Sequence, residues 1–419
     1  MWHRTLGMTQ IFFGLLLTLF LTVQGQAQTN VHTKRTHVFK ESIPHLSSRI
    51  DILKQSRMRS DYNHEVIFVI KQKNMEELTS FLHDVSDPSS DNYGQHMTRT
   101  TVSDMTSNPV GRDSVMEYLH ATGATVVAET LGGEYITATA PISVWEGMFN
   151  CEFYMFHQTR ENDIISRVVR TESYSIPVHL NDHVDSVFNT VQMPHENLIR
   201  VRLGPAVVVP GEEKFDLQAI SFTTPPKLRA AYNVGTNTGS NSSTQCIYAS
   251  LNQYYSPADL SKFQTTYNLK QQSISTVIGG HESSFMCILS PSSCAEANLD
   301  VQYIMAASPV SPTTFWYTEL NWFSEWLVTV ANTAKPALVI SISYGMEEQY
   351  VTNSERDTFN TQAIKLGAMG VTIVAASGDD GAISRNARVS PNSCRYAPIF
   401  PASSPYVTAV GATMVCLCV

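Results

Sequence analysis

Ala337–Gly345 reads ALVISISYG, and Val371–Gly381 reads VTIVAASGDDG. Each stretch starts with a run of apolar and β-branched residues, and Gln245–Ser250 has the same character. Helical stretches such as Asp300–Ala307 and Ser354–Leu366 alternate with these runs. Uninterrupted apolar strands separated by helices are typical of a parallel sheet covered on both faces. We therefore expect an α/β domain in this half of the chain.

Polar loops follow two of these predicted strands. One is Tyr344–Glu348, and the other is Ser377–Gly381, which contains the acid Asp379. In open parallel sheets, sites form in the loops at the carboxyl ends of the strands. These two loops are therefore the first places where we expect functional side chains.

The N-terminal half, from about Thr36 to Pro194, mixes strand and helix signals with hairpins, which favours an α+β domain with an antiparallel sheet. Asn74 is a candidate N-cap for the first helix, and Gly132-Gly133 is a hairpin turn signal. The expected strands are Glu65–Lys71, Thr125–Thr130, Glu134–Ala140 and Glu152–Gln158, and the expected helices are Met75–Val85, Ser114–Thr122 and Ile142–Phe149.

Residues 1–27 have the pattern of a signal peptide. His3 and Arg4 precede the apolar run Ile11–Val23, and small residues follow up to Ala27 at the spacing that signal peptidase needs. The alternative is a signal anchor, but spanning a bilayer takes about 20 apolar residues and this run is shorter. We expect cleavage near Ala27, entry into the secretory pathway and no stable membrane anchor.

Residues 197–222 separate the two halves. This segment carries Leu203-Gly204-Pro205 and Pro210-Gly211 without an amphipathic period, so we expect an exposed connector or processing segment. Asn241-Ser242-Ser243 lies just beyond it and is the N-glycosylation sequon of the chain. We expect Asn241 at the surface of a secreted protein.

Composition excludes some partners. The 419 residues are 43% hydrophobic and 16% charged, which supports packed cores, and the net charge is -9. Nucleic acids and anionic membranes select basic patches, so neither is an expected partner. Of the seven cysteines, Cys287 and Cys294 would close a short loop in an oxidising lumen, and none has the C-x-x-C spacing of a zinc site. We expect no metal site.

The predicted helix Cys294–Ala307 carries two acids, and we expect it to be buried because it is apolar almost all round. Glu296 and Asp300 are four residues apart and lie on one helix face. Two adjacent carboxylates repel, so one is expected to hold a proton, which lets Glu296 act as a general base with Asp300 behind it. Alternatively, Ser293 caps the helix and both acids complement its dipole.

Asp379 also has two interpretations. An acid beside a glycine at the end of a strand is usually a turn former. In a site, Asp379 would donate a hydrogen bond to a developing oxyanion, which requires the protonated carboxyl. That role would favour acidic pH.

The order of several motifs resembles the sedolisin family of serine-carboxyl peptidases. The N-terminal stretch Phe81–Gln95 resembles the activation prodomain of that family, and Thr224–Val234 resembles the start of its catalytic domain. The similarity runs from about Thr36 to Gly411. In the C-terminal half the motifs are Glu296-x-x-x-Asp300, Ser341-Ile342-Ser343-Tyr344-Gly345, Ala376-Ser377-Gly378-Asp379-Asp380-Gly381 and Phe400–Gly411.

The resemblance implies a role for each residue. Glu296 would be the base that deprotonates a serine, Asp300 its partner and Asp379 the oxyanion stabiliser. Ser341, Ser343, Tyr344 and Gly345 would form a strand edge that pairs with an extended peptide. The implied fold is a ferredoxin-like prodomain at 36–196 followed by a subtilisin-like catalytic domain at 223–419, incomplete. Secretion or lysosomal delivery, peptide substrates and inhibition by the chain's own prodomain are also implied.

One part of the family pattern is missing. The family's nucleophile lies in a Gly-Thr-Ser motif, and that tripeptide does not occur in these 419 residues. The resemblance places the family's calcium site in the missing part too, so no cofactor is expected here. Three interpretations stay open: a peptidase with a truncated or mis-spliced record, a short form that acts as a prodomain-type inhibitor, and a secreted binding protein without catalysis. Under the first interpretation, we expect the chain as given to be inactive.

Overall fold

The computed structural model describes residues 36–49, 51–160, 163–194, 223–319, 323–383 and 395–412. The expected signal peptide at 1–27, the connector at 197–222 and Cys394, Cys416 and Cys418 lie outside these ranges. Within the ranges, none of the helices combines the length and the apolar character that crossing a bilayer requires.

The C-terminal half is built on a six-stranded sheet whose order is β11-β12-β10-β13-β15-β17. Every neighbouring pair in this sheet is parallel. The parallel sheet predicted from the apolar runs is therefore confirmed. Its strands are β10 (Gln245–Ala249), β11 (Thr276–Ile278), β12 (Thr313–Tyr317), β13 (Val339–Ile342), β15 (Thr372–Ala376) and β17 (Thr408–Val410).

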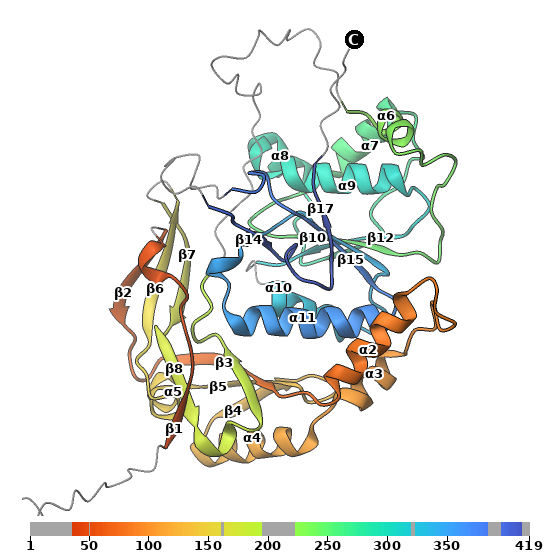
Figure 1. The fold of residues 1–419 in the computed structure, drawn as a ribbon. Helices are drawn as coiled ribbons and strands as arrows, with labels where there is room; N and C mark the ends of the chain where they lie inside the picture. Colours follow the sequence, from red (N-terminus) through yellow and green to blue (C-terminus); the bar gives the residue numbers. More distant parts are fainter. Residues whose placement is uncertain are drawn as a thin grey trace, which may run out of the picture. The chain divides into compact units, whose positions relative to one another are not determined.

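Helices cover both faces of this sheet, as Figure 1 shows. Successive residues of a strand point to opposite faces, and β10 illustrates the rule. Ile247 packs with α9 (Ala295–Ala307), whereas Tyr248 packs with α10 (Phe323–Ala331) and α11 (Asn353–Ala368). The other elements of this half are α6 (Pro225–Ala231), α7 (Pro257–Thr266), α8 (Ser284–Leu289), β14 (Met346–Glu347) and β16 (Ile399–Phe400).

The N-terminal half is α+β and antiparallel, as predicted. Its largest sheet has the order β4-β5-β3-β9, and the Gly132-Gly133 turn joins β4 to β5 in antiparallel pairing. The strands are β1 (His37–Ser42), β2 (Ile52–Arg57), β3 (Asn63–Ile70), β4 (Thr125–Glu129), β5 (Tyr135–Pro141), β6 (Tyr154–Arg160), β7 (Asp163–Arg170), β8 (Ser173–Pro177) and β9 (Val184–Phe188). The helices are α2 (Met75–Ser86), α3 (Arg99–Thr106), α4 (Pro109–Thr122) and α5 (Ile142–Phe149).

Two local predictions in this half need correction. Asn74 precedes α2, but its backbone is left-handed with φ 54° and its side chain does not cap the helix. Its amide Nδ2 instead donates to the carbonyl of Met105 at 2.8 Å. The predicted helix Ser114–Thr122 begins earlier, because Asn108 caps the amide of Gly111 and Pro109 fits the first turn.

Helix α11 packs against the sheet on one side and against the N-terminal half on the other. Thr352 and Glu355 form a capping box at its start, which satisfies two backbone donors in a buried helix end. Its other polar side chains find partners in the N-terminal half. Ser354 Oγ donates to Glu41 at 2.7 Å, Gln362 Nε2 donates to the Tyr135 hydroxyl at 2.8 Å, and Lys365 Nζ donates to Glu134 at 2.6 Å.

The Lys365–Glu134 ion pair is buried, with side-chain exposures of 7% and 3%. Burial opposes ionisation of Glu134, but the Lys365 ammonium outweighs it and holds the pKa of Glu134 below its ordinary value. Removing one member of such a pair leaves a buried charge without compensation.

We predict that Lys365→Met lowers the free energy of unfolding by about 3–5 kcal/mol, as one-sided removal of a buried ion pair does. The double variant Lys365→Met/Glu134→Gln should recover much of that loss, because no uncompensated charge remains. Guanidinium unfolding of the two variants and the wild type measures this. Because the pKa of Glu134 is lowered, the wild type should begin to lose this contribution as pH falls below about 4.5. A Lys365→Met protein as stable as the wild type would contradict the account.

Candidate functional site

The two predicted acids lie on α9, which begins at Ala295. Glu296 is in the first turn, and Asp300 follows one turn later on the same side. Ala297 and Val301 pack into the core with β10, which fixes the rotation of the helix. Leu299 is 49% exposed, so the expectation that the helix is buried all round is wrong. The helix has one buried face because only one of its sides meets the sheet.

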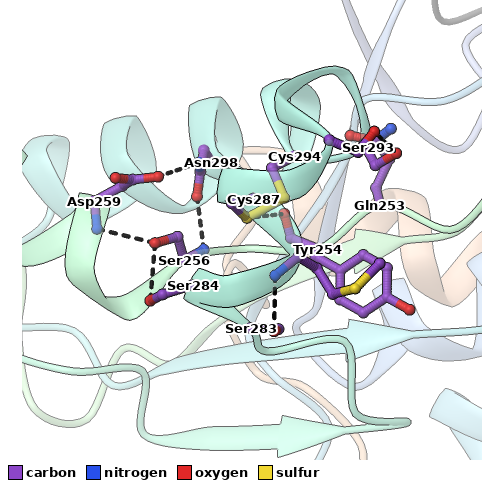
Figure 2. Close-up of a disulfide and its surroundings, with 12 residues drawn as sticks. Gln253, Tyr254, Ser256, Asp259, Ser283, Ser284, Cys287, Ser293, Cys294 and Asn298 are labelled. Atoms are coloured by element: carbon purple, nitrogen blue, oxygen red, sulfur yellow. Dashed lines mark hydrogen bonds between the residues drawn. A yellow bond between two sulfur atoms is a disulfide. The ribbon is translucent and has the colours of Figure 1, made fainter.

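The start of α9 is held by a disulfide. Cys287 in α8 is bonded to Cys294, which confirms the predicted pairing (Figure 2). Cys294 occupies the position before the helix, and Ser293 belongs to a short 3-10 turn, Pro291–Ser293. Ser293 does not cap the helix, so that interpretation is wrong, and the Gln253 side chain instead accepts from the amide of Glu296 at 3.3 Å. The disulfide also orients the first turn.

Ser343 links the acid pair to the sheet. It follows β13 directly, and its Oγ donates to Asp300 Oδ1 at 2.7 Å. The same hydroxyl also favours the charged form of Glu296. One serine therefore touches both acids from the carboxyl end of a central strand.

The environment of the pair disfavours two negative charges. The pKa of Glu296 is raised to about 7, mainly by burial and also by the charge of Asp379, while the Ser343 hydroxyl acts in the opposite direction. Burial also raises the pKa of Asp300 well above its ordinary value, and the charge of Glu296 adds to this effect. Asp300 Oδ2 is out of contact with solvent and has no hydrogen-bond partner among the described residues. We infer that the pair holds at least one proton at neutral pH.

Asp379 follows β15, the strand next to β13, and lies near the acid pair. β13 and β15 pair in parallel, with Ile342 opposite Ala375, so the residues after both strands lie at one edge of the sheet. Gly378 has φ 90°, which allows the chain to turn just before Asp379. Asp379 is exposed, and its charge reaches Glu296. The acids predicted from two separate motifs thus converge.

The residues predicted to form a substrate-binding strand edge do not all fit that role. Ser341 lies within β13, paired with β10 on one side and β15 on the other, so it offers no free edge. Tyr344 is buried, and its hydroxyl donates to the carbonyl of Ser250 at 3.4 Å. The strand-edge prediction is therefore wrong for Ser341, because its strand is central in the sheet.

Gly345 has a packing role. A Cβ added there would lie 2.5 Å from Ile399 Cγ2 and 2.9 Å from the carbonyl oxygen of Phe400. The glycine lets the chain approach β16, which pairs with β14. Of the four predicted residues, Ser343 is the one with a described hydrogen bond to the acids. The sequence showed that Ser343 follows an apolar strand, but it did not show that Asp300 is its hydrogen-bond partner.

Other predicted sites are simpler. Asn241 is exposed at a turn, where a glycan would fit. In the part of the chain that the structure describes, no group of three or more His, Cys, Asp or Glu side chains is arranged to hold a metal ion.

Comparison with known proteins gives matches in both halves. The family described as "Pro-kumamolisin, activation domain" matches residues 51–193. Tripeptidyl-peptidase 1 from Homo sapiens is 30% identical over 377 residues, which are 85% of this chain and 62% of that protein. Physarolisin from Physarum polycephalum is 31% identical over 369 residues, 83% of this chain and 59% of that protein. The chain thus spans about three fifths of these relatives.

A solved structure of Pseudomonas sedolisin, a serine-carboxyl proteinase, also matches. The TM-score is 0.34 at 20% sequence identity, and the match covers 45% of this chain and 52% of that one. Because this TM-score is low, only the sequence matches support a relationship between this chain and known proteins.

We predict that Glu296→Gln changes how stability depends on pH. Because the pKa of Glu296 is raised to about 7, the folded chain binds this proton more tightly than the unfolded chain between pH 4.5 and 7. Stability should therefore fall across that window as pH rises, by roughly 1–3 kcal/mol from this group. Guanidinium unfolding at pH 5 and pH 7 should show a shallower fall in Glu296→Gln.

Glu76→Gln is the matched control, because Glu76 is exposed on α2. This variant should keep the pH dependence of the wild type. The same pH dependence in Glu296→Gln and the wild type would contradict the assignment of a raised pKa to Glu296.

Proposed function

The chain belongs to the sedolisin family of serine-carboxyl peptidases, and we propose that it carries the activation prodomain and the acidic half of a peptidase site. The observation that supports this proposal is the contact between Ser343 and the buried pair Glu296 and Asp300, with Asp379 beside them. The reaction we propose is hydrolysis of peptide bonds at acidic pH.

In this mechanism Glu296 takes the proton of a nucleophilic serine, and Asp300 keeps the pair singly protonated. Asp379 donates to the oxyanion once it is protonated. Neutralising Asp379 removes one of the effects that raise the pKa of Glu296, so a proton on Asp379 makes Glu296 easier to ionise. A general base and an acid donor with opposed requirements give a bell-shaped pH profile.

The nucleophile is the part of the mechanism that these residues do not supply. Gly-Thr-Ser is absent from the 419 residues, and we propose that a longer form of the protein provides it. The resemblance implies a calcium site in that longer form, and the steps proposed for these residues do not involve it. Without a nucleophile, a base and an oxyanion donor leave only residual catalysis.

We further propose the remaining features of the precursor. These are a signal peptide at 1–27, a ferredoxin-like prodomain at 36–196, a connector at 197–222, a subtilisin-like fold from 223, and delivery to the lysosome or the exterior. One relative carries the name tripeptidyl-peptidase 1. Identification of the cleavage products would distinguish removal of tripeptides from cleavage at internal peptide bonds.

Peptide cleavage tests the main proposal. We predict that a form containing the Gly-Thr-Ser motif cleaves an internally quenched peptide with a maximum below pH 6, and that the 419-residue chain does not. Glu296→Gln should lower kcat by roughly 10²–10⁴-fold, the usual contribution of a general base. Asp379→Ala should lower kcat by roughly 10²–10³-fold, as loss of one oxyanion donor does. Full activity in Glu296→Gln, or activity that rises steadily to pH 8, would contradict the proposal.

A second candidate function is inhibition by the N-terminal half acting in trans. The polar contacts of α11 favour it, because Ser354, Gln362 and Lys365 all bind side chains of that half. An N-terminal half that binds one catalytic unit in this way has the complementary groups to bind a related one.

Mixing tests the second candidate. We predict that the 419-residue chain slows peptide cleavage by an active relative such as human tripeptidyl-peptidase 1. Lys365→Met should inhibit more strongly, because it weakens the intramolecular contact and frees the N-terminal half. Val110→Ser, on an exposed part of α4, should behave as the wild type does. Unchanged cleavage with excess of either the wild-type chain or Lys365→Met would rule out inhibition.

A further inference from the structure

The first turn of α9 is not capped by the residue that precedes it. Cys294 occupies the cap position, but its sulfur is bonded to Cys287 and its side chain makes no capping hydrogen bond. The first hydrogen bond of the helix runs from the amide of Asn298 to the carbonyl of Cys294 at 2.9 Å. The three amides before Asn298 have no acceptor within the helix. They need acceptors from other parts of the chain.

Gln253 supplies one such acceptor. It lies four residues beyond the end of β10, and its Oε1 accepts from the amide of Glu296 at 3.3 Å. Its Nε2 donates to the carbonyl of Ser292 at 3.2 Å. Figure 2 shows Gln253 near Ser293, where the 3-10 turn leads into α9. One side chain thus binds the backbone on both sides of Cys294.

Other contacts hold the start of α9 without the Gln253 side chain. The amide of Tyr254 donates to the carbonyl of Ser293 at 2.8 Å, and the disulfide joins Cys294 to α8. Ala297 packs into the core with β10. We therefore expect α9 to keep its place when the side chain of Gln253 is changed, so its contact with the Glu296 amide can be tested alone.

The Glu296 amide matters because Glu296 is the acid of this first turn. A carboxylate in the first turn of a helix is attracted to the free amides there, and hydrogen bonds from them favour its charged form. Gln253 occupies the amide of Glu296, so that donor is not available to the Glu296 carboxylate. A carboxylate that turned back to cap its own helix would leave Ser343 and would be a weaker base.

The groups around the Glu296 carboxyl come from three segments of the described chain. Ser343 follows β13 and favours the charged form of Glu296, whereas the charge of Asp379 after β15 disfavours it. The charge of Glu296 in turn raises the pKa values of Asp300 on the same helix and of Tyr344 after β13. Small displacements of Glu296 therefore change its acidity.

We propose that Gln253 is a positioning residue that keeps the Glu296 carboxyl beside Ser343 and Asp300 by binding the Glu296 amide. The consequence for catalysis rests on the proposed peptidase function. The inference adds the loop after β10 to the segments that form the site, and it assigns to that loop the control of how readily Glu296 accepts a proton.

Infrared spectra of the 419-residue chain test the inference without a nucleophile. The carboxyl band of Glu296 is isolated by subtracting the spectrum of the same protein with Glu296→Gln added. In Gln253→Leu, which lacks the acceptor, we expect this band to decline at a pH lower by roughly half a unit, as for one interaction at a helix end. Gln253→Glu keeps an acceptor and adds a negative charge, so the band should decline at a higher pH than in the wild type.

Gln95→Leu is the matched control. Gln95 is exposed in the N-terminal half, and its Nε2 also donates to a backbone carbonyl, that of Asp91, at 3.0 Å. Its removal should leave the Glu296 band as it is in the wild type.

Three results would overturn the inference. An unchanged Glu296 band in Gln253→Leu would mean that Gln253 is a helix cap without influence on the acid. A shift in the same direction in Gln253→Leu and Gln253→Glu, or loss of the protonated Asp300 band, would indicate general loosening of α9.

Kinetics separate this inference from the proposed function. In a form that contains the Gly-Thr-Ser motif, Gln253→Leu should lower kcat and leave KM nearly unchanged, because substrate binding does not involve the Glu296 amide. A form with that motif that cleaves no peptide would contradict the proposed function, whereas the infrared result would still decide the role of Gln253.

Discussion

The parallel pairing of β13 with β15 is the constraint on which the site depends. It places Ser343 and Asp379 at the same edge of the sheet, because both follow strands that run in one direction. Helix α9 lies over that sheet with its apolar side against β10, and this orientation brings Glu296 and Asp300 to Ser343. Four residues from three segments meet because one sheet fixes the directions of two strands and one helix.

The fold keeps this acid pair in a setting that disfavours its charge. Burial raises the pKa of both Glu296 and Asp300, and the serine that touches them is held at the end of a central strand. Burying such polar groups costs free energy, which the packing around them has to offset. Here a disulfide fixes the start of α9. On the other face of the sheet, α11 is buried between the strands and the N-terminal half.

The sequence predicted the elements whose patterns are local. The apolar runs gave the parallel strands, and the spacing of Glu296 and Asp300 placed both acids on one side of a helix. The sequence could not show that Ser341 has no free strand edge, because that depends on which strands pair with β13. The contact of Ser343 with Asp300, across 43 residues of sequence, depends on that same pairing. The contact of Gln253 with the amide of Glu296 was missed for a similar reason, because it joins segments that are distant in the sequence.

The central claim is that Glu296 and Asp300 form a coupled pair with raised pKa values. Infrared titration of the carboxyl stretch tests it directly, using difference spectra between the wild type and the variants Glu296→Gln and Asp300→Asn. We predict that Glu296 gives a protonated carboxyl band that persists at pH 6 and declines near pH 7, and that this component is missing in Glu296→Gln, while the buried Asp300 keeps its own band. A wild type whose difference spectra show both carboxyls ionised at pH 5 would contradict the account.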